Sequence, residues 1–281
     1  MTLKKGLTRA GLGDIGPDER FIELASAYGF ESVDLDAAAF VARHGVQGAR
    51  EILARHGVSL GSVGLPVEWR ASEEQFLQGL EKLRTTAEAA AALGGTRCCT
   101  YILPSTDLPA AGFMATAVRR LRLCANILGA YGIRLGLEYV GPHHLRTRWA
   151  NPFIWTQADT LELIDAIQLP NVGLLIDSIH WYTNGLTEQD LASLPASKIV
   201  HVHLNDAPDV PVEEVLDNGR LLPGEGVIDL AAFLRGIAAT GYDGPVAQEV
   251  LTAAPPAEPV ESILERSRAG YARVFAAAGL S

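Results

Sequence analysis

The run RLGLEYVGP at residues 134–142 sets the pattern from which the fold of this chain is worked out. It is an apolar stretch that carries one acid, Glu138, just before a loop begins at Gly141. Three later runs share this arrangement, namely VGLLIDSIH at 172–180, IVHVHLNDAP at 199–208 and PVAQEVL at 245–251. Because parallel strands are covered on both faces, they are near-continuous apolar runs. We therefore predict four buried parallel strands, each with an acid or an imidazole towards its carboxyl end.

Outward from these runs, short β-rich stretches alternate with Ala/Leu-rich amphipathic stretches along the whole chain. This alternation is typical of a parallel sheet covered by helices. The predicted strands cover residues 5–9, 32–36, 59–65, 96–103, 134–139, 172–177, 199–204 and 245–250. The predicted helices cover residues 17–28, 48–56, 73–93, 111–131, 156–167, 187–194, 228–240 and 260–278.

Eight such pairs can close into a barrel or lie open as a doubly wound sheet. An open dinucleotide-binding sheet would be favoured by G-x-G-x-x-G after the first strand, whereas the nearest run here is GLGDIGP. Barrels of about 250 residues form one domain. We predict an α/β fold, a single-domain (β/α)₈ TIM barrel over residues 1–281.

Composition narrows the function classes. A formal net charge of −10 and a pI near 5.2 disfavour nucleic-acid binding. No apolar run approaches the roughly 20 residues of a membrane span, and the start MTLKKGLTRAGLG has no apolar signal region. We therefore expect a cytoplasmic protein without a membrane partner. The three cysteines do not indicate a disulfide framework, and each is expected to pack in the interior.

The polar strand ends indicate a metal site. A single acid at such a place is as often a helix cap, but four polar ends in order can converge at the carboxyl-terminal face where barrel active sites lie. Three carboxylates there would repel one another unless a cation neutralised them. With one imidazole, this set suits Mn²⁺, Mg²⁺ or Co²⁺ better than a structural zinc. We predict one divalent metal ion, with Mn²⁺ preferred and Zn²⁺ as a further alternative, bound by Glu138, Asp177, His203 and Glu249.

A neighbouring imidazole has a different predicted place. His201 points to the same side of its strand as His203, because side chains two residues apart share a face. It lies further from the carboxyl end, so we interpret it as a packed residue or one that supports the ligands.

At these residues the chain resembles the xylose isomerase-like TIM barrel superfamily, which includes sugar phosphate isomerases and epimerases, ketose 3-epimerases and endonuclease IV. The resemblance covers nearly the whole chain. It implies Glu138, Asp177, His203 and Glu249 as metal ligands, His180 as a substrate contact, and Glu138 and Glu249 as the catalytic pair that removes and returns a proton. It rests on LEY at Glu138, D-x-x-H at Asp177 and His180, HVHLND around His203, LLPGEGVIDL at 221–230, and QEV at Glu249.

One departure concerns arginine. Ketose epimerases commonly place an arginine a few residues after the metal-binding histidine, but LNDAPDVP follows here and the next arginine is Arg220. We predict that Arg220 takes that substrate-binding role. The alternative is a solvated loop arginine.

The loops predict a polyhydroxylated small-molecule substrate. The four tryptophans, Trp69, Trp149, Trp155 and Trp181, all follow predicted strand ends, and aromatic faces stack on the apolar faces of sugar rings. The basic loop GPHHLRTRWANP after Glu138 contributes His143 as a further substrate contact. For each of these residues the alternative is packing or a solvated loop.

The predicted function is a metal-dependent isomerase or epimerase that acts on a sugar, keto-sugar or cyclitol through an enediolate that the bound metal stabilises. A dehydratase or lyase on a keto-cyclitol or dehydroshikimate-like substrate uses the same chemistry and stays the main alternative. A non-catalytic sugar-binding barrel is a further class. An endonuclease IV-like nuclease is disfavoured, because its three-zinc cluster needs histidines that the third and fourth strand ends lack. A homodimer or tetramer is a hypothesis.

Overall fold

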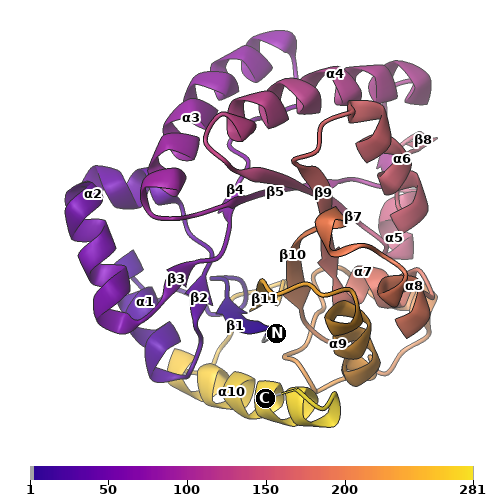
Figure 1. Ribbon diagram of the computed structural model, residues 1–281. Helices are drawn as coiled ribbons and strands as arrows, with labels where there is room; N and C mark the ends of the chain where they lie inside the picture. Colours follow the sequence, from indigo (N-terminus) through magenta and orange to yellow (C-terminus); the bar gives the residue numbers. More distant parts are fainter. Residues whose placement is uncertain (1–2, 281) are drawn as a thin grey trace.

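The computed structural model describes residues 3–280 and contains the predicted barrel (Figure 1). Its main sheet has the order β3-β2-β1-β11-β10-β9-β7-β5-β4, and neighbouring strands are parallel. The strands are β1 (Lys4–Leu7), β2 (Ser32–Val33), β3 (Ser59–Leu60), β4 (Val63–Gly64), β5 (Arg97–Ile102), β7 (Arg134–Tyr139), β9 (Val172–Asp177), β10 (Ile199–Leu204) and β11 (Pro245–Gln248).

The barrel closes through one predicted strand that the structure divides in two. β3 pairs with β2, whereas β4 pairs with β5, and only Gly61 and Ser62 separate the two halves. The backbone of this short break remains bonded on both sides, since Gly61 donates to Val33 (2.8 Å) and Leu65 donates to Cys99 (2.9 Å). The predicted single-domain TIM barrel is thus confirmed as a fold.

Helices form the outer layer around the sheet (Figure 1). Short elements also flank the strands. An antiparallel pair joins β6 (Ser105–Thr106) to β8 (Asn151–Pro152), and the short helices are α5 (His143–Arg146), α7 (Ser178–Thr183), η1 (Ala196–Lys198) and η2 (Val212–Glu214). The main helices are α1 (Asp18–Ala27), α2 (Ala37–His56), α3 (Glu73–Ala92), α4 (Ala110–Gly129), α6 (Gln157–Ile167), α8 (Glu188–Ala192), α9 (Leu230–Ala239) and α10 (Val260–Ala277).

The predicted start of the second helix, at Gly48, was wrong. α2 begins at Ala37, because Asp36 caps it by accepting a hydrogen bond from the Ala39 N–H (3.0 Å). Gly45 has φ 68° inside the helix and breaks its regular geometry. This break makes the first half look like a loop in the sequence. The helix ends as expected at Gly57, whose φ of 63° lies in the left-handed region.

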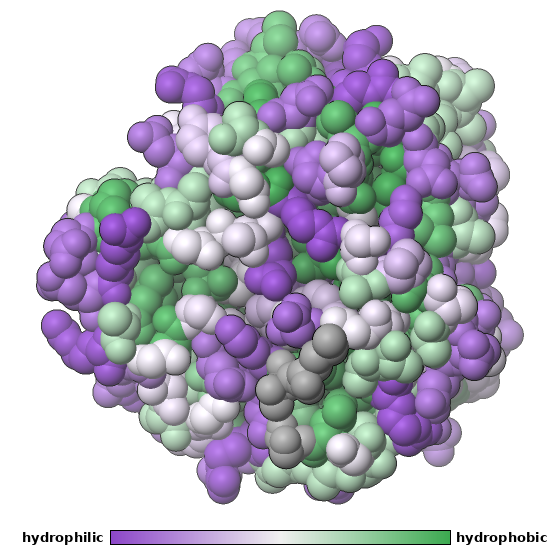
Figure 2. Space-filling model, in the orientation of Figure 1, coloured by the Kyte–Doolittle hydropathy of each residue, from purple (hydrophilic) through white to green (hydrophobic). Residues whose placement is uncertain are grey.

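The hydrophobic core lies between the sheet and the helices. The outward-facing residues of β9 and β10, such as Leu174, Ile176, Val202 and Leu204, are fully buried. Each such side chain contributes about 1.5–3 kcal/mol through burial. On the face shown in Figure 2, hydrophilic and hydrophobic side chains are interspersed over the helical rim, as expected when each helix turns its apolar stripe inward. Of the helices described, none is long and apolar enough to cross a membrane.

Candidate active site

Four side chains from four adjacent strands meet at one end of the barrel. Glu138 lies near the end of β7, Asp177 ends β9, His203 lies in β10, and Glu249 follows β11. The register sets Asp177 directly beside His203. One potential ligand atom from each of the four residues lies within 4.8 Å of the others. The structure therefore brings together the four residues predicted as metal ligands.

The carboxylates surround a single nitrogen of the imidazole. Nδ1 of His203 lies 3.3 Å from Oε2 of Glu249, 3.7 Å from Oε1 of Glu138 and 3.9 Å from Oδ2 of Asp177. Among the described residues, neither His203 Nδ1 nor Glu138 Oε1 has a hydrogen-bond partner, although both atoms are buried. Buried polar atoms are nearly always satisfied, so a missing group is indicated here. A divalent cation would satisfy both atoms and neutralise the carboxylates.

The charges of the cluster show how it is balanced without a cation. Burial raises the pKa of Glu138. Burial would also raise the pKa of Glu249, but His203 and Arg220 outweigh it and hold that pKa well below its usual range. Burial would lower the pKa of His203, but Glu249, Asp34 and Glu138 raise it well above its usual value. A proton on His203 therefore compensates the carboxylates, and a metal ion would have to displace it.

Arg220 lies beside two of the candidate metal ligands. Its buried guanidinium donates from Nη1 to Asp177 Oδ2 (2.9 Å) and Glu249 Oε2 (2.8 Å), and from Nη2 to Asp217 Oδ1 (2.7 Å). All these partners are protein carboxylates. The side chain therefore fixes two of the candidate ligands, whereas its predicted substrate contact stays a prediction.

The loop that carries Arg220 is held by a buried acid. Asp206, just after β10, accepts hydrogen bonds from the backbone N–H groups of Gly224 (3.0 Å), Gly226 (2.9 Å) and Ile228 (2.9 Å). A Cβ at Gly226 would lie 2.1 Å from the carbonyl oxygen of Ala207, so the close approach requires glycine. The HVHLND and LLPGEG motifs thus form one structural unit that places Arg220 over the ligands.

His180, predicted as a substrate contact, lies beside Glu138. The Gly141 N–H donates to its Nδ1 (3.3 Å), which leaves Nε2 3.8 Å from Glu138 Oε1 and 4.0 Å from Asp217 Oδ1. Gly141 allows this approach, because a Cβ there would lie 2.4 Å from Thr183 Oγ1. His180 can therefore meet a substrate oxygen beside Glu138.

Trp69 and His143 lie apart from the four ligands. Trp69 is fully buried, stacks on Phe113 with ring centroids 5.7 Å apart, and donates from Nε1 to Thr100 (3.3 Å). His143 lines a separate cavity of about 730 Å³ together with Trp155 and Trp181. The structure does not bring either residue to the metal ligands.

The sequence prediction missed Asp34, at the carboxyl end of β2. Its Oδ2 lies 2.9 Å from Nε2 of His201 and 3.6 Å from Nε2 of His203. Burial would raise its pKa, but these two imidazoles hold that pKa well below its usual range. His201 therefore supports the ligand layer as interpreted from the sequence. The signal for Asp34 was present in VDLD at 33–36, an acid at a strand end like those used for the other ligands.

The chain break at β3 and β4 holds Asp34 in place. Ser62 donates to Asp34 from its N–H (2.8 Å to Oδ1) and from its hydroxyl (2.8 Å to Oδ2). A Cβ at Gly61 would lie 2.4 Å from Asp34 Oδ1, so a glycine is needed beside the carboxylate. The irregularity that divides the predicted strand thus positions an acid behind His203.

A cavity of about 230 Å³ opens above the cluster. One cysteine faces it, which corrects the expectation that each cysteine packs in the interior. Burial raises the pKa of Cys99 to about 12, so its sulfur stays protonated at neutral pH. The three cysteines are free. The cavity lining includes Thr8, Asp34, Ser62, Cys99, Thr100, Glu138, His203 and Glu249.

Comparisons with known proteins agree with this fold. The family described as xylose isomerase-like TIM barrel matches residues 22–269. A solved xylose isomerase domain protein from Alicyclobacillus acidocaldarius superimposes with a TM-score of 0.92 at 39% sequence identity, covering 99% of this chain and 100% of the other.

Curated relatives match shorter parts of the chain. An inosose isomerase from Halalkalibacterium halodurans is 30% identical over 136 residues, which cover 46% of each protein. A ketose 3-epimerase from Arthrobacter globiformis is 27% identical over 219 residues, covering 73% of this chain and 68% of the epimerase. A 3-dehydroshikimate dehydratase from Pseudomonas aeruginosa is 33% identical over 133 residues, which are 46% of this chain and 20% of the dehydratase. The match to the inosose isomerase thus spans just under half of that relative's length.

Proposed function

Because the chain belongs to the xylose isomerase-like TIM barrel family, we propose that it is a divalent-metal-dependent isomerase or epimerase of a sugar, keto-sugar or cyclitol. The observation that supports this most strongly is the convergence of three carboxylates on Nδ1 of His203. Burying several ionisable groups at one point is costly, and such clusters are concentrated at functional sites. A sugar-binding barrel without chemistry would not need them.

In this proposal Glu138, Asp177, His203 and Glu249 hold the cation, and Mn²⁺ is our preferred identity. The oxygen-rich set supports Mn²⁺, Mg²⁺ or Co²⁺, while Zn²⁺ remains an alternative. When bound, the ion would polarise the carbonyl and hydroxyl oxygens of the substrate and so acidify the neighbouring C–H. Arg220 and Asn205 fix the Asp177 carboxylate, since Nη1 of Arg220 and Nδ2 of Asn205 each lie 2.9 Å from its Oδ2.

The two glutamates carry the proton. Glu138 comes from β7 and Glu249 from beyond β11, with β9 and β10 between them, so they approach the substrate from two sides. One carboxylate removes the proton from the carbon beside the carbonyl, and the electron pair moves to the carbonyl oxygen as an enediolate forms. Return of a proton by the other carboxylate inverts that carbon. Return of the proton to the former carbonyl carbon, with the hydroxyl proton passing to the former carbonyl oxygen, gives aldose–ketose isomerisation.

A dehydratase is the second candidate, supported by the similarity to 3-dehydroshikimate dehydratase. The first step would be the same proton removal. The electron pair would then expel the hydroxyl group of the adjacent carbon. That hydroxyl takes up a proton and leaves as water. His180, whose Nε2 lies 3.8 Å from Glu138 Oε1, is suitably placed to supply that proton. The product would be an alkene instead of an epimer or isomer.

Product analysis separates these candidates. The Mn²⁺-loaded protein would be incubated with D-fructose, an inosose and 3-dehydroshikimate, and the products followed by proton NMR. We expect an epimer or isomer of a ketose or inosose, with conversion abolished by EDTA and restored by Mn²⁺. Conversion that persists after complete metal removal would contradict the proposal, and formation of an alkene alone would favour the dehydratase.

A further inference from the structure

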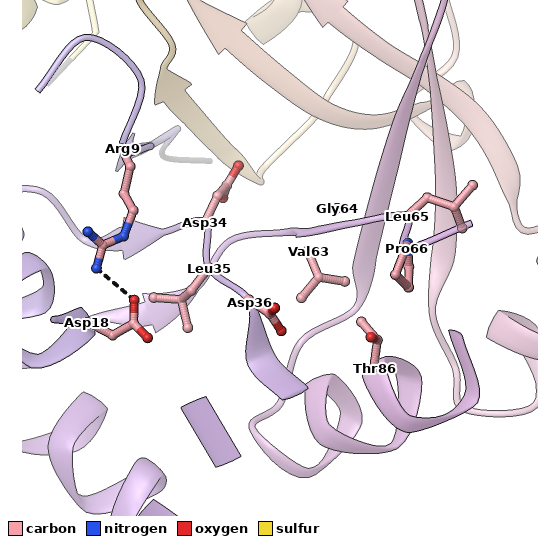
Figure 3. Close-up of a pocket in the computed structure, with 10 residues that line it drawn as sticks. All are labelled: Arg9, Asp18, Asp34, Leu35, Asp36, Val63, Gly64, Leu65, Pro66 and Thr86. Atoms are coloured by element: carbon pink, nitrogen blue, oxygen red, sulfur yellow. Dashed lines mark hydrogen bonds and ion pairs between the residues drawn. The ribbon is translucent and has the colours of Figure 1, made fainter. Parts of the chain in front are cut away.

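A second cavity adjoins the one above the metal ligands (Figure 3). It measures about 470 Å³, against about 230 Å³ for the metal cavity. The two cavities share three lining residues, Asp34, Val63 and Gly64. Asp34 follows β2 and Val63 begins β4, so the second cavity continues the first on this side of the barrel.

The metal cavity alone is small compared with most sites for drug-sized molecules. Sites for small molecules commonly measure about 300–1,000 Å³, and the metal cavity lies below that range. With the adjoining space, the whole falls within it. A substrate whose reacting carbonyl lies at Glu138 and Glu249 can therefore extend past Asp34.

The walls of this second cavity combine apolar and fixed polar groups. Leu35, Val63, Leu65 and Pro66 form the apolar part. Such a surface packs against the C–H face of a sugar ring. The charged side chains are Arg9, Asp18, Asp34 and Asp36.

These charged groups are held in place by the protein. Arg9 donates to Asp18 (2.7 Å) and to the carbonyl oxygen of Gly16 (3.0 Å), and its guanidinium lies 4.9 Å from the ring centroid of Phe21. Asp36 is fixed as the cap of α2. Rigid donors and acceptors lose little entropy when they bind hydroxyl groups.

The balance of charge excludes an anionic group here. Three carboxylates and one guanidinium line the cavity, and the guanidinium is already paired with one of the carboxylates, Asp18. A phosphate or carboxylate would therefore be repelled. Vicinal hydroxyls, in contrast, can both donate to carboxylates and accept from the guanidinium.

We propose that this cavity, which we name the substituent subsite, binds a neutral, hydroxyl-rich substituent such as a second sugar ring. The substrate that binds most tightly is then a glycoside of a keto-sugar, ahead of a free monosaccharide or a sugar phosphate. This inference rests on the proposed function, because it assumes that the keto group reacts at the metal cavity.

The test compares two probes on the Mn²⁺-loaded protein by titration calorimetry. The one-ring probe is methyl 3-keto-α-D-glucopyranoside, and the two-ring probe is 3-keto-trehalose, which carries a glucosyl group in place of the methyl. We expect the two-ring probe to bind at least ten-fold more tightly. Equal or weaker binding of the two-ring probe would overturn the subsite, and this comparison needs no substitution.

A matched pair of variants locates the effect. Arg9→Met removes the guanidinium from the subsite, whereas Arg20→Met removes an exposed arginine of α1 that pairs with Glu23 and Glu261. We expect Arg9→Met to reduce the preference for the two-ring probe to less than three-fold, with the affinity for the one-ring probe unchanged. Arg20→Met should retain the full preference for the two-ring probe. An unaltered preference in Arg9→Met would place the second ring elsewhere.

Deuterium exchange from D₂O into the one-ring probe shows whether the subsite alone is wrong or the proposed function is wrong as well. Exchange without a preference for the two-ring probe would contradict the subsite and leave the proposed function standing. Binding of neither probe would overturn both the subsite and the keto-sugar substrate.

Discussion

Replacing Asp34 with asparagine should weaken metal binding, although Asp34 is not one of the predicted ligands. Oδ1 of Asp34 is occupied by the Ser62 N–H at 2.8 Å, and Oδ2 faces Nε2 of His201 and of His203. In Asp34→Asn the amide oxygen would stay with the Ser62 N–H, so the amide NH₂ would face the two imidazoles. An N–H group on His203 Nε2 would then meet a donor.

The consequence concerns the tautomer of His203. A ligating imidazole binds metal through the nitrogen that carries no proton, and the partner of its other nitrogen selects that state. With an NH₂ group opposite, Nε2 prefers to accept, and the proton moves to Nδ1, the atom that faces Glu138, Asp177 and Glu249. Loss of such a partner typically weakens metal affinity about 10–100-fold. At about 1.4 kcal/mol per factor of ten, this corresponds to about 1.4–2.8 kcal/mol of binding free energy.

The assay is titration with Mn²⁺ followed by electron paramagnetic resonance, which reports the free ion and does not depend on activity. Asp36→Asn is the matched control, because it makes the same chemical change two residues away on a side chain that caps α2 and does not line the metal cavity. Ser62→Ala provides a milder test, since it removes the hydroxyl donor to Asp34 and leaves the backbone one. A dissociation constant for folded Asp34→Asn within two-fold of wild type would refute the reasoning.

Three further predictions concern the same network. Arg220→Met leaves the buried Asp177 and the part-buried Asp217 and Glu249 without their partner and should lower the free energy of unfolding of the metal-free protein by about 3–5 kcal/mol. In thermal melts with Arg220→Lys as control, Mn²⁺ should stabilise the Met variant more than wild type, and equal stabilisation by Mn²⁺ would argue against this role of Arg220. Because the pKa of His203 is raised, its proton must leave before the metal binds, and Mn²⁺ affinity should fall as the pH is lowered through and below neutrality. Calorimetry in two buffers of different ionisation enthalpy should show that proton release. An Mn²⁺ affinity that does not change with pH would contradict this prediction. Asp206→Ala deprives three backbone N–H groups of their acceptor and should cost at least about 3 kcal/mol in urea unfolding; a cost below about 1 kcal/mol would show that the loop does not depend on Asp206.

The sequence predicted the fold best where strands are buried on both faces. The bounds of β7, β9 and β10 match the predicted ranges, because their runs are apolar apart from the site residues. The bounds of β2 are shorter than predicted, since Leu35 and Asp36 already belong to the loop and cap before α2. Gly45 concealed the first half of α2, because a glycine inside a helical pattern also signals a helix end.

The candidate site was predictable only as far as strand positions determine it. Glu138, Asp177, His203 and Glu249 stand out because polar residues are unexpected in apolar strands. Asp34 did not, since its half-polar run also fits a helix cap. Where the Arg220 side chain points depends on the loop that Asp206 holds. The burial of Trp69 depends on Phe113 and Thr100, which are distant in sequence. Such long-range contacts have no local pattern.

The most direct test of the central claim is deuterium incorporation by the Mn²⁺-loaded protein in D₂O, with an inosose or a 3-keto-glucoside as substrate. The account predicts exchange at a carbon beside the carbonyl, observed by proton NMR, and its loss in Glu249→Gln with the protein still folded. Exchange that continues undiminished in both Glu138→Gln and Glu249→Gln, or its absence in the metal-loaded wild type with every keto-sugar and keto-cyclitol tried, would contradict it.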